Sequence, residues 1–334
     1  MKVLVTGGAG YIGSVVAEEL LQAGHEVVVF DNLSRGHRQA VPKNAELVVG
    51  DLADRAALDQ LLQSRAINFR GFDAVMHFAA LIEAGESMKA PEQFFRNNTA
   101  NALTLLEAML AVRVPRFVFS STAALYGNPD RTPLAEDDPL RPTNAYGESK
   151  LLVERMLAWF HQIHGLGYAS LRYFNAAGAS RPDKGEAHQP ETHLIPRILE
   201  VALGRREHVK IFGTDYSTPD GTCIRDYIHV SDLARAHLLA LEALALGNSP
   251  PLIYNLGNGH GFSVREVVEV ARQVTGHPVP VIESPRRAGD PAVLIASSEK
   301  IRRELDWQPK FPDLKTIVES AWQWHRTHPD GYPG

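Results

Sequence analysis

The stretch that most constrains the fold of this chain lies near its amino end, where three glycines follow a short apolar run. Val3–Val5 has the length and composition of a buried strand, and Gly7, Gly10 and Gly13 follow it at a spacing of three residues. An apolar helical pattern begins at Ile12. Glycines here let the backbone approach a diphosphate closely, and the helix offers that diphosphate its free N–H groups and positive end. The stretch therefore predicts a dinucleotide-binding turn.

An acidic residue after the next apolar run indicates which dinucleotide is bound. Asp31 follows Val27–Phe30 and lies 18 residues past Gly13. A carboxylate at this place accepts hydrogen bonds from an adenosine ribose, and its charge repels a 2′-phosphate. We therefore expect NAD rather than NADP as the cofactor.

Charge and cysteine content exclude several classes of protein. The formal net charge of −5 shows no basic excess for nucleic acid. A single cysteine, Cys223, excludes an internal disulfide and thiolate zinc clusters, and no arrangement of the histidines leads us to predict a metal site. The sequence shows neither a signal-peptide pattern nor an apolar run of membrane-helix length. We expect a soluble, cytoplasmic protein with no nucleic-acid or membrane partner.

Strands and helices alternate through the first half of the chain. A helix is expected at residues 98–112, and short apolar runs predict four further strands, at 47–49, 74–78, 116–120 and 168–174. This alternation is typical of an α/β protein with a Rossmann-type, doubly wound parallel sheet, which binds its ligand at the carboxyl ends of the strands.

The second half of the chain has shorter elements and loops rich in proline and glycine, at residues 182–196 and 213–221. Such loops indicate a substrate-binding region. We expect an NAD-binding domain at 1–175 and a smaller α/β substrate domain at 176–334. Because no linker separates the halves, the two should be interlocked, with segments near 225–246 packing back on the first domain.

Tyr146 and Lys150 form a candidate catalytic pair. They lie four residues apart in a helix that Thr143 or Asn144 would cap, so they share one face of it. A free tyrosine has a pKa near 10 and is a poor base at neutral pH. An ammonium about 4 Å away lowers that pKa by roughly three units at an effective dielectric of 20. The apolar residues that predict the buried face of this helix are Leu152, Met156, Trp159, Phe160 and Ile163.

Hydroxyl groups support a catalytic role for this pair. Ser120–Thr122 ends the fifth predicted strand, where a doubly wound sheet opens its crevice. A hydroxyl group there would form hydrogen bonds to both a reacting oxygen and the Tyr146 phenol. In the alternative interpretation, the hydroxyl groups only complete the hydrogen bonds at the strand end, and Tyr146 and Lys150 lie on an ordinary amphipathic helix. The glycine turn, the Tyr146–Lys150 pair and these hydroxyl groups converge on one crevice. We therefore predict that Tyr146 takes a hydroxyl proton while a hydride leaves the same carbon.

These motifs together resemble the extended short-chain dehydrogenase/reductase family. The stretches that carry the resemblance are the glycine run, Asp31–Asn32, His77–Ala80, Ser120–Gly127, Tyr146-x-x-x-Lys150 and Arg172–Asn175. Later stretches are similar to the UDP-glucose 4-epimerase family in particular: Ile211–Tyr216, Asp220–His229, Tyr254–Gly257, Pro285–Asp290 and Trp322–Tyr332. The resemblance covers essentially the whole chain.

The resemblance implies reversible epimerisation of UDP-glucose and UDP-galactose at C4, through a 4-keto sugar and a tightly bound, recycled NAD. Tyr146 would take the proton of the 4-hydroxyl, Thr122 would be its hydroxyl partner, and Lys150 would hold the nicotinamide ribose and lower the pKa of Tyr146. The family usually forms homodimers through helices that flank the sheet, and the helix at 98–112 is a candidate for that contact.

The resemblance also implies two sets of binding residues. The NAD set is Gly7, Gly10, Tyr11, Ile12, Gly13, Asp31, Asn32, Asp51, Leu52, Phe78, Ala79, Ala80, Asn98, Thr122, Tyr146, Lys150 and Phe174. The UDP-sugar set is Thr122, Tyr146, Asn175, His193, Phe212, Arg225, Arg287 and Asp290. Two arginines suit a diphosphate and would leave the hexose free to turn. Asp51 has an alternative role as a helix cap.

Three residues depart from the family pattern. Ile82 stands where some members have a lysine that reaches the cofactor, and His193 stands where some have an asparagine beside the sugar–phosphate link. Leu294 stands where a tyrosine narrows the hexose pocket of members restricted to unacetylated sugars. A smaller side chain leaves room for a 2-acetamido group, so UDP-N-acetylglucosamine and UDP-N-acetylgalactosamine are expected as further substrates.

Other functions are disfavoured by particular residues. A 4,6-dehydratase needs an acid and a base, normally Asp-Glu directly after the threonine, whereas Ala123-Ala124 follows Thr122. A sugar decarboxylase is disfavoured by the same missing glutamate. An NAD-sensing binding protein would have no need to keep Tyr146 and Lys150.

Overall fold

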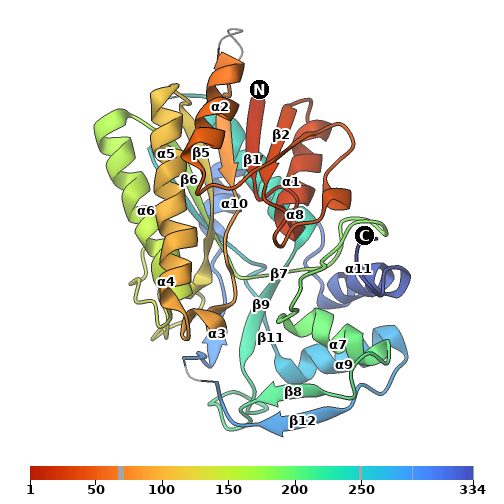
Figure 1. Cartoon of the computed structure of the whole chain (residues 1–334). Coiled ribbons are helices and arrows are strands. Elements are labelled where there is room, and N and C mark those ends of the chain that lie inside the picture. Colours follow the sequence, from red (N-terminus) through yellow and green to blue (C-terminus); the bar gives the residue numbers. More distant parts are fainter. Residues whose placement is uncertain (67–70, 248–249, 288, 334) are drawn as a thin grey trace. The chain divides into compact units, whose positions relative to one another are not determined.

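The computed structural model describes residues 1–66, 71–247, 250–287 and 289–333 (Figure 1). Ala288, inside the predicted motif Pro285–Asp290, and Gly334 lie outside these residues. The chain divides into two compact units. Unit 1 comprises Met1–Leu125, Pro142–Arg172 and Ala234–Tyr254; unit 2 comprises Tyr126–Arg141, Tyr173–Leu233 and Asn255–Gly334.

A seven-stranded sheet forms the centre of unit 1, with the order β10-β6-β5-β4-β1-β2-β3. Strand β1 pairs in parallel with both β2 and β4, so the strand order reverses beside β1. This reversal is the switch point at which doubly wound sheets bind ligands. The predicted Rossmann-type α/β fold is confirmed. The strands are β1 Lys2–Thr6, β2 Glu26–Asp31, β3 Glu46–Val49, β4 Ala74–His77, β5 Arg116–Thr122, β6 Gly167–Tyr173 and β10 Leu252–Leu256.

Helices α2, α5 and α6 share one hydrophobic core with the sheet (Figure 1). Leu58, Leu106 and Leu157 represent the three helices in this core, and Phe117 and Phe119 of β5 face them. The helical segments up to α8 are α1 Tyr11–Gln22, η1 Arg38–Ala40, α2 Arg55–Ala66, α3 Ala84–Ser87, α4 Pro91–Phe94, the π-helix η2 Phe95–Ala100, α5 Asn101–Ala111, η3 Ala123–Tyr126, α6 Ala145–His164 and α8 Val230–Ala245.

The predicted buried face of α6 is partly wrong. Trp159 and Ile163 are 63% and 65% exposed. The buried positions include the polar residues Lys150 and Glu154 together with Leu157. Since both polar side chains have buried partners in unit 1, the inward face is less apolar than an amphipathic pattern assumes, and apolar side chains alone misplace it.

Unit 2 contains two small sheets and four helices in its described part. Strand β9 Ile224–His229 is the centre of the first sheet and pairs with β7 Asn175–Ala177, β11 Gly261–Ser263 and β13 Val293–Leu294. Strands β8 Val209–Phe212 and β12 Val281–Ser284 form the second sheet. The helices are α7 Leu194–Ala202, α9 Val264–Thr275, α10 Glu299–Leu305 and α11 Leu314–Thr327. No helix in the described ranges has the length and apolar character that a membrane crossing requires.

Candidate active site

The glycine turn is shaped by close contacts between backbone segments. Gly7 has a φ of +73°, and a Cβ atom on it would lie 2.4 Å from the backbone nitrogen of Ala79. A Cβ atom on Gly13 would lie 2.3 Å from the carbonyl oxygen of Gly7. In the described segment Gly10–Ser14, the first turn of α1 contains neither a capping side chain nor an acid. Its N–H groups can therefore bind an anion.

Asp31, at the end of β2, is held in place beside this turn. It is 8% exposed and accepts hydrogen bonds from the backbone N–H groups of Ala9, at 3.0 Å, and Leu33, at 2.9 Å. Burial raises the pKa of Asp31, and these two hydrogen bonds oppose the rise. Each oxygen retains a lone pair for a further donor, as recognition of a ribose requires.

Asn32 and Asp51 come together in the loops that follow β2 and β3. The Asn32 amide donates to the Asp51 carboxylate at 2.7 Å, and Asp51 also accepts the Ala53 N–H at 2.8 Å. Asp54, not Asp51, accepts from the first turn of α2, at the N–H of Ala57. The alternative role of Asp51 as the helix cap is therefore not observed.

Asn98 organises the segment that follows β4. This residue of η2 is 1% exposed, accepts the Leu81 N–H at 2.8 Å, and donates to the Leu81 carbonyl at 2.9 Å and to Ser149 at 3.0 Å. It thereby ties the half-buried Phe78–Ala80 stretch to α6. Asn98 therefore positions these two segments relative to each other through its hydrogen bonds.

Lys150 is buried at the base of the proposed catalytic group. Lys150 is 2% exposed, and its Nζ donates to the carbonyl oxygen of Ser120 at 2.9 Å. Nζ also lies 4.9 Å from the centroid of the Phe119 ring. Burial lowers the pKa of Lys150 to about 7. His77 nearby is a packed core histidine, as predicted, and burial together with the charge of Lys150 lowers its pKa to about 3.

The expected lowering of the Tyr146 pKa is not found. Burial raises the pKa of Tyr146, the hydrogen bond with Thr122 lowers it, and the charge of Glu83 raises it further. Burial is the largest of these effects, and Lys150 donates to the Ser120 carbonyl. The protein places the predicted hydroxyl partner, Thr122, against the phenol and leaves Tyr146 protonated at neutral pH.

Helix α6 carries Tyr146 and Lys150 on a rigid support. Asn144 caps the helix by accepting the Gly147 N–H at 2.8 Å. Glu154 accepts from Arg172 of β6 at 2.6 Å and from Ser121 of β5 at 2.6 Å. These buried bonds tie α6 to two adjacent strands.

Two predicted pairs of UDP-sugar residues meet in unit 2. Arg225 of β9 donates to the carboxylate of Asp290 at 3.1 Å. The guanidinium of Arg287 lies over the Phe212 ring, 3.8 Å from its centroid. Burial lowers the pKa of Arg287, the charge of Asp290 opposes this, and the charges of Arg197 and Arg225 lower it further. This excess of positive charge suits a diphosphate.

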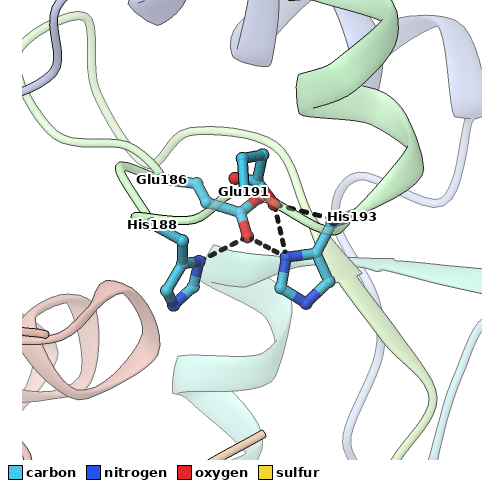
Figure 2. Close-up of side chains that lie close together, drawn as sticks. All are labelled: Glu186, His188, Glu191 and His193. Atoms are coloured by element: carbon cyan, nitrogen blue, oxygen red, sulfur yellow. Dashed lines mark hydrogen bonds and ion pairs between the residues drawn. The ribbon is translucent and has the colours of Figure 1, made fainter. Parts of the chain in front are cut away.

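His193 lies at the N-cap of α7 and contacts two acids that the sequence analysis missed. Its Nδ1 lies 2.8 Å from Glu186 and 2.9 Å from Glu191, and His188 also contacts Glu186 (Figure 2). Burial lowers the pKa of His193, but these carboxylates raise it, and the result is a pKa well above the usual value. The sequence signal was present as two acids and two histidines within residues 186–193.

The remaining predicted residues are placed as follows. Tyr11 and Ile12 begin α1, and the side chain of Leu52 is buried in the core of unit 1. In unit 2, Asn175 pairs with Tyr227 between β7 and β9, and Phe174 donates its N–H to the Leu256 carbonyl. Every predicted NAD residue except Phe174 belongs to unit 1, and every UDP-sugar residue except Thr122 and Tyr146 belongs to unit 2.

A model of the NAD dependent epimerase/dehydratase family matches residues 3–257. The chain belongs to this family. It is 54% identical over 333 residues to the UDP-glucose 4-epimerase of Halalkalibacterium halodurans, covering 99% of this chain and 98% of the relative.

Solved structures of epimerases from this group share the fold. A UDP-glucose 4-epimerase from Bifidobacterium longum in complex with NAD+ and UDP has a TM-score of 0.93 and 36% identity, covering 99% of this chain and 100% of that one. The UDP-Glc/GlcNAc 4-epimerase from Campylobacter jejuni has a TM-score of 0.84 and 42% identity, covering 98% of this chain and 99% of that one.

Proposed function

We propose that this protein interconverts UDP-glucose and UDP-galactose at C4 with a tightly bound NAD. The observation that carries the proposal is the arrangement of Tyr146, Thr122 and Lys150 at the carboxyl end of β5, in the unit that also contains the glycine turn. The 54% identity to a UDP-glucose 4-epimerase supports the same activity.

The residues of unit 1 fit NAD. The backbone contacts of Gly7 leave no space for a side chain, the N–H groups at the start of α1 suit the diphosphate, and Asp31 suits the adenosine ribose. Bound NAD supplies a reversible hydride acceptor. Because it is reoxidised within the same turnover, it has no need to leave the protein.

The chain's own residues manage the proton and the nucleotide. The phenol of Tyr146 first releases its proton to solvent; the phenolate then accepts the proton of the sugar 4-hydroxyl and returns it to the same oxygen when the 4-keto sugar is reduced. Thr122 holds the phenol by a hydrogen bond. Lys150 supplies a positive charge that Ser120 orients. Arg225 and Arg287 hold the diphosphate in unit 2, so that the 4-keto sugar can turn over before it is reduced on the opposite face.

Alternative chemistry in the family is disfavoured by the same strand end. A dehydratase needs an acid–base pair after the threonine, and Ala123 and Ala124 occupy these positions in η3. A protein that only senses NAD would have no use for the Thr122–Tyr146 hydrogen bond.

The position of Leu294 supports turnover of the N-acetylated UDP-hexoses as well. Leu294 of β13 is half-buried and lies opposite Arg225 in the parallel register with β9. A leucine beside a nucleotide-binding arginine leaves more room than a tyrosine would.

The exposed apolar side chains of two helices support a homodimer. Trp159 and Ile163 lie one turn apart on α6, and Leu103 of α5 is 37% exposed. A second copy of the chain would bury this surface. The buried free thiol of Cys223 supports a cytoplasmic location.

The function is tested by incubating the purified protein with UDP-glucose and observing UDP-galactose by NMR. The wild type should form it, and Tyr146→Phe should lose nearly all turnover while it still binds nucleotide. Tyr168→Phe removes a hydroxyl from the core of unit 1 and should stay active. Absence of UDP-galactose, or full activity of Tyr146→Phe, would refute the proposal.

A further inference from the structure

Four potential metal ligands lie within one short segment of unit 2. Glu186, His188, Glu191 and His193 all belong to the connection between β7 and α7, and they face one another (Figure 2). One ligand atom from each residue lies within 4.8 Å of the other three.

The contacts within this cluster join carboxylates to ring nitrogens. Glu186 Oε1 lies 2.9 Å from His188 Nδ1 and 2.8 Å from His193 Nδ1, and Glu191 Oε1 lies 2.9 Å from His193 Nδ1. Both histidines therefore direct the same nitrogen, Nδ1, at the acids. The Nε2 atom of His193 points away from them (Figure 2), so it remains available for the nucleotide.

The two carboxylates of the cluster suit a divalent cation. Glu186 and Glu191 are 4% and 8% exposed. These two carboxylates form ion pairs with His188 and His193. A metal ion would displace the proton of His193, and the two carboxylates would then carry a charge of about −2 beside neutral imidazoles. A divalent ion would balance this charge.

The backbone around the cluster is anchored from three directions. Trp324 of α11 donates its Nε1–H to the Glu186 carbonyl at 2.9 Å, and Tyr332 donates to the Gly185 carbonyl at 3.2 Å. Arg197 of α7 donates to the Glu191 carbonyl at 3.1 Å. Glu191 is oriented further by the N–H groups of Thr192 and His193. Ligands on an anchored backbone lose less entropy when they bind an ion.

We infer that Glu186, His188, Glu191 and His193 bind one divalent transition-metal ion of the zinc class through two imidazole nitrogens and two carboxylate oxygens. Two nitrogen ligands favour zinc over Mg2+ or Ca2+, which prefer oxygen alone. In a tetrahedral shell with bonds of about 2.1 Å, ligand atoms lie roughly 3.4 Å apart. The closest pairs therefore need to separate by about half an ångström, which small side-chain rotations allow.

The ion would tie the long connection between β7 and α7 to the start of α7. This connection runs from Gly178 to His193 and contains a single-residue bridge between Arg181 and Lys184. Closing a connection of this length at an internal point stabilises the folded chain. The role is structural, and no step at the sugar C4 passes through the ion.

The test measures zinc binding by the full-length protein with its cofactor. The protein is stripped with a chelator and dialysed, zinc is returned, and the bound metal is counted by mass spectrometry. The wild type should retain one zinc per chain and show a zinc-dependent rise in melting temperature. His188→Asn should lose affinity by more than the roughly 10- to 100-fold that changes outside the ligand shell cost. The exposed His277→Asn is the matched control and should bind like the wild type.

A second measurement covers the case in which His188→Asn does not fold. Cobalt added to the stripped wild type should produce the visible absorption of a four-coordinate site with nitrogen and oxygen ligands, and zinc should displace it. Equal zinc binding by the wild type and His188→Asn, or a wild type with neither retained zinc nor a cobalt spectrum, would overturn the inference. Because the readouts do not depend on turnover, failure of the metal site is distinguishable from failure of the proposed epimerisation.

Discussion

The ammonium of Lys150 and the carbonyl oxygen of Ser120 are joined by a buried hydrogen bond of 2.9 Å between α6 and the end of β5. Lysine is expensive to bury, and the pKa of Lys150 is lowered to about 7 by this burial. A protein that needed only a stable helix would place an apolar side chain here. The bond therefore indicates that a lysine is kept here for function, and its acceptor Ser120 lies two residues before Thr122 in β5.

Replacement of Lys150 should separate function from stability. Lys150→Met should lower kcat by about 100-fold or more, since it removes the positive charge beside the reacting groups. The variant should still fold, because the charge that it removes is costly to bury. Lys89→Met is the control, since Lys89 is 72% exposed and pairs with Glu86 on the surface. Steady-state kinetics check the prediction, and a Lys150→Met enzyme as active as Lys89→Met would contradict it.

The glycine turn offers a matched pair of substitutions. Gly7→Ala places a methyl group 2.4 Å from the Ala79 nitrogen at a φ of +73°, whereas Gly24→Ala has a φ of +82° and no atom within 4 Å. Gly24→Ala should cost only the backbone strain of about 1–2 kcal/mol. Gly7→Ala should cost clearly more and should also lose bound NAD. Thermal denaturation and the NAD released on denaturation report both effects; equal losses would mean that the close approach to Ala79 is unimportant.

Asp226 predicts a pH dependence of stability. Its buried carboxylate accepts the N–H groups of Asn258, Gly259 and Ala296, and burial raises its pKa to about 6 although these bonds oppose the rise. Between pH 4 and 6 the folded state keeps a proton that the unfolded state has lost. The free energy of unfolding should therefore fall as pH rises, by about 1.4 kcal/mol per pH unit from this group.

Asp226→Asn removes that titration and isolates its contribution. Urea denaturation from pH 4 to 6 should show the wild type losing stability relative to the variant as the pH rises. The variant has one fewer acceptor oxygen, so it should be less stable at every pH at which both fold. Parallel stability curves for the two proteins would show that Asp226 does not titrate in this range.

The acceptance of acetylated sugars is tested at Leu294. Leu294→Tyr should reduce turnover of UDP-N-acetylglucosamine by more than about 10-fold and should leave turnover of UDP-glucose nearly unchanged, because only the acetamido group meets the added ring. Leu294→Met keeps a flexible side chain of similar size and is the control. A wild type that never turns over the acetylated sugars, or a tyrosine variant that does so normally, would contradict the role given to Leu294.

The sequence predicted the parallel sheet well because its strands are continuous apolar runs and its helices have clear periodicity. It also predicted a cap at Thr143 or Asn144, and Asn144 forms it by accepting from a residue three positions away. It failed at Trp159 and Ile163, because the inward side of α6 is set by the buried bonds of Lys150 and Glu154 with distant residues. A hydrophobic pattern does not contain those partners.

Long-range pairing also explains the other differences. Strands β7, β11 and β13 have two or three residues each and exist because β9 pairs with them. These strands are too short to show the alternation of apolar and polar residues from which a strand is predicted. The pKa of Tyr146 depends on burial and on its hydrogen bond with Thr122, neither of which follows from a spacing of four residues.

The central claim, a closed redox cycle on a cofactor that stays bound, is tested most directly by following the hydrogen at C4. UDP-glucose that carries deuterium at C4 is incubated with the purified protein without added NAD, and the product is examined by NMR. The claim predicts UDP-galactose that retains the deuterium at C4. Loss of the label to water, or turnover that begins only when NAD is added, would contradict it.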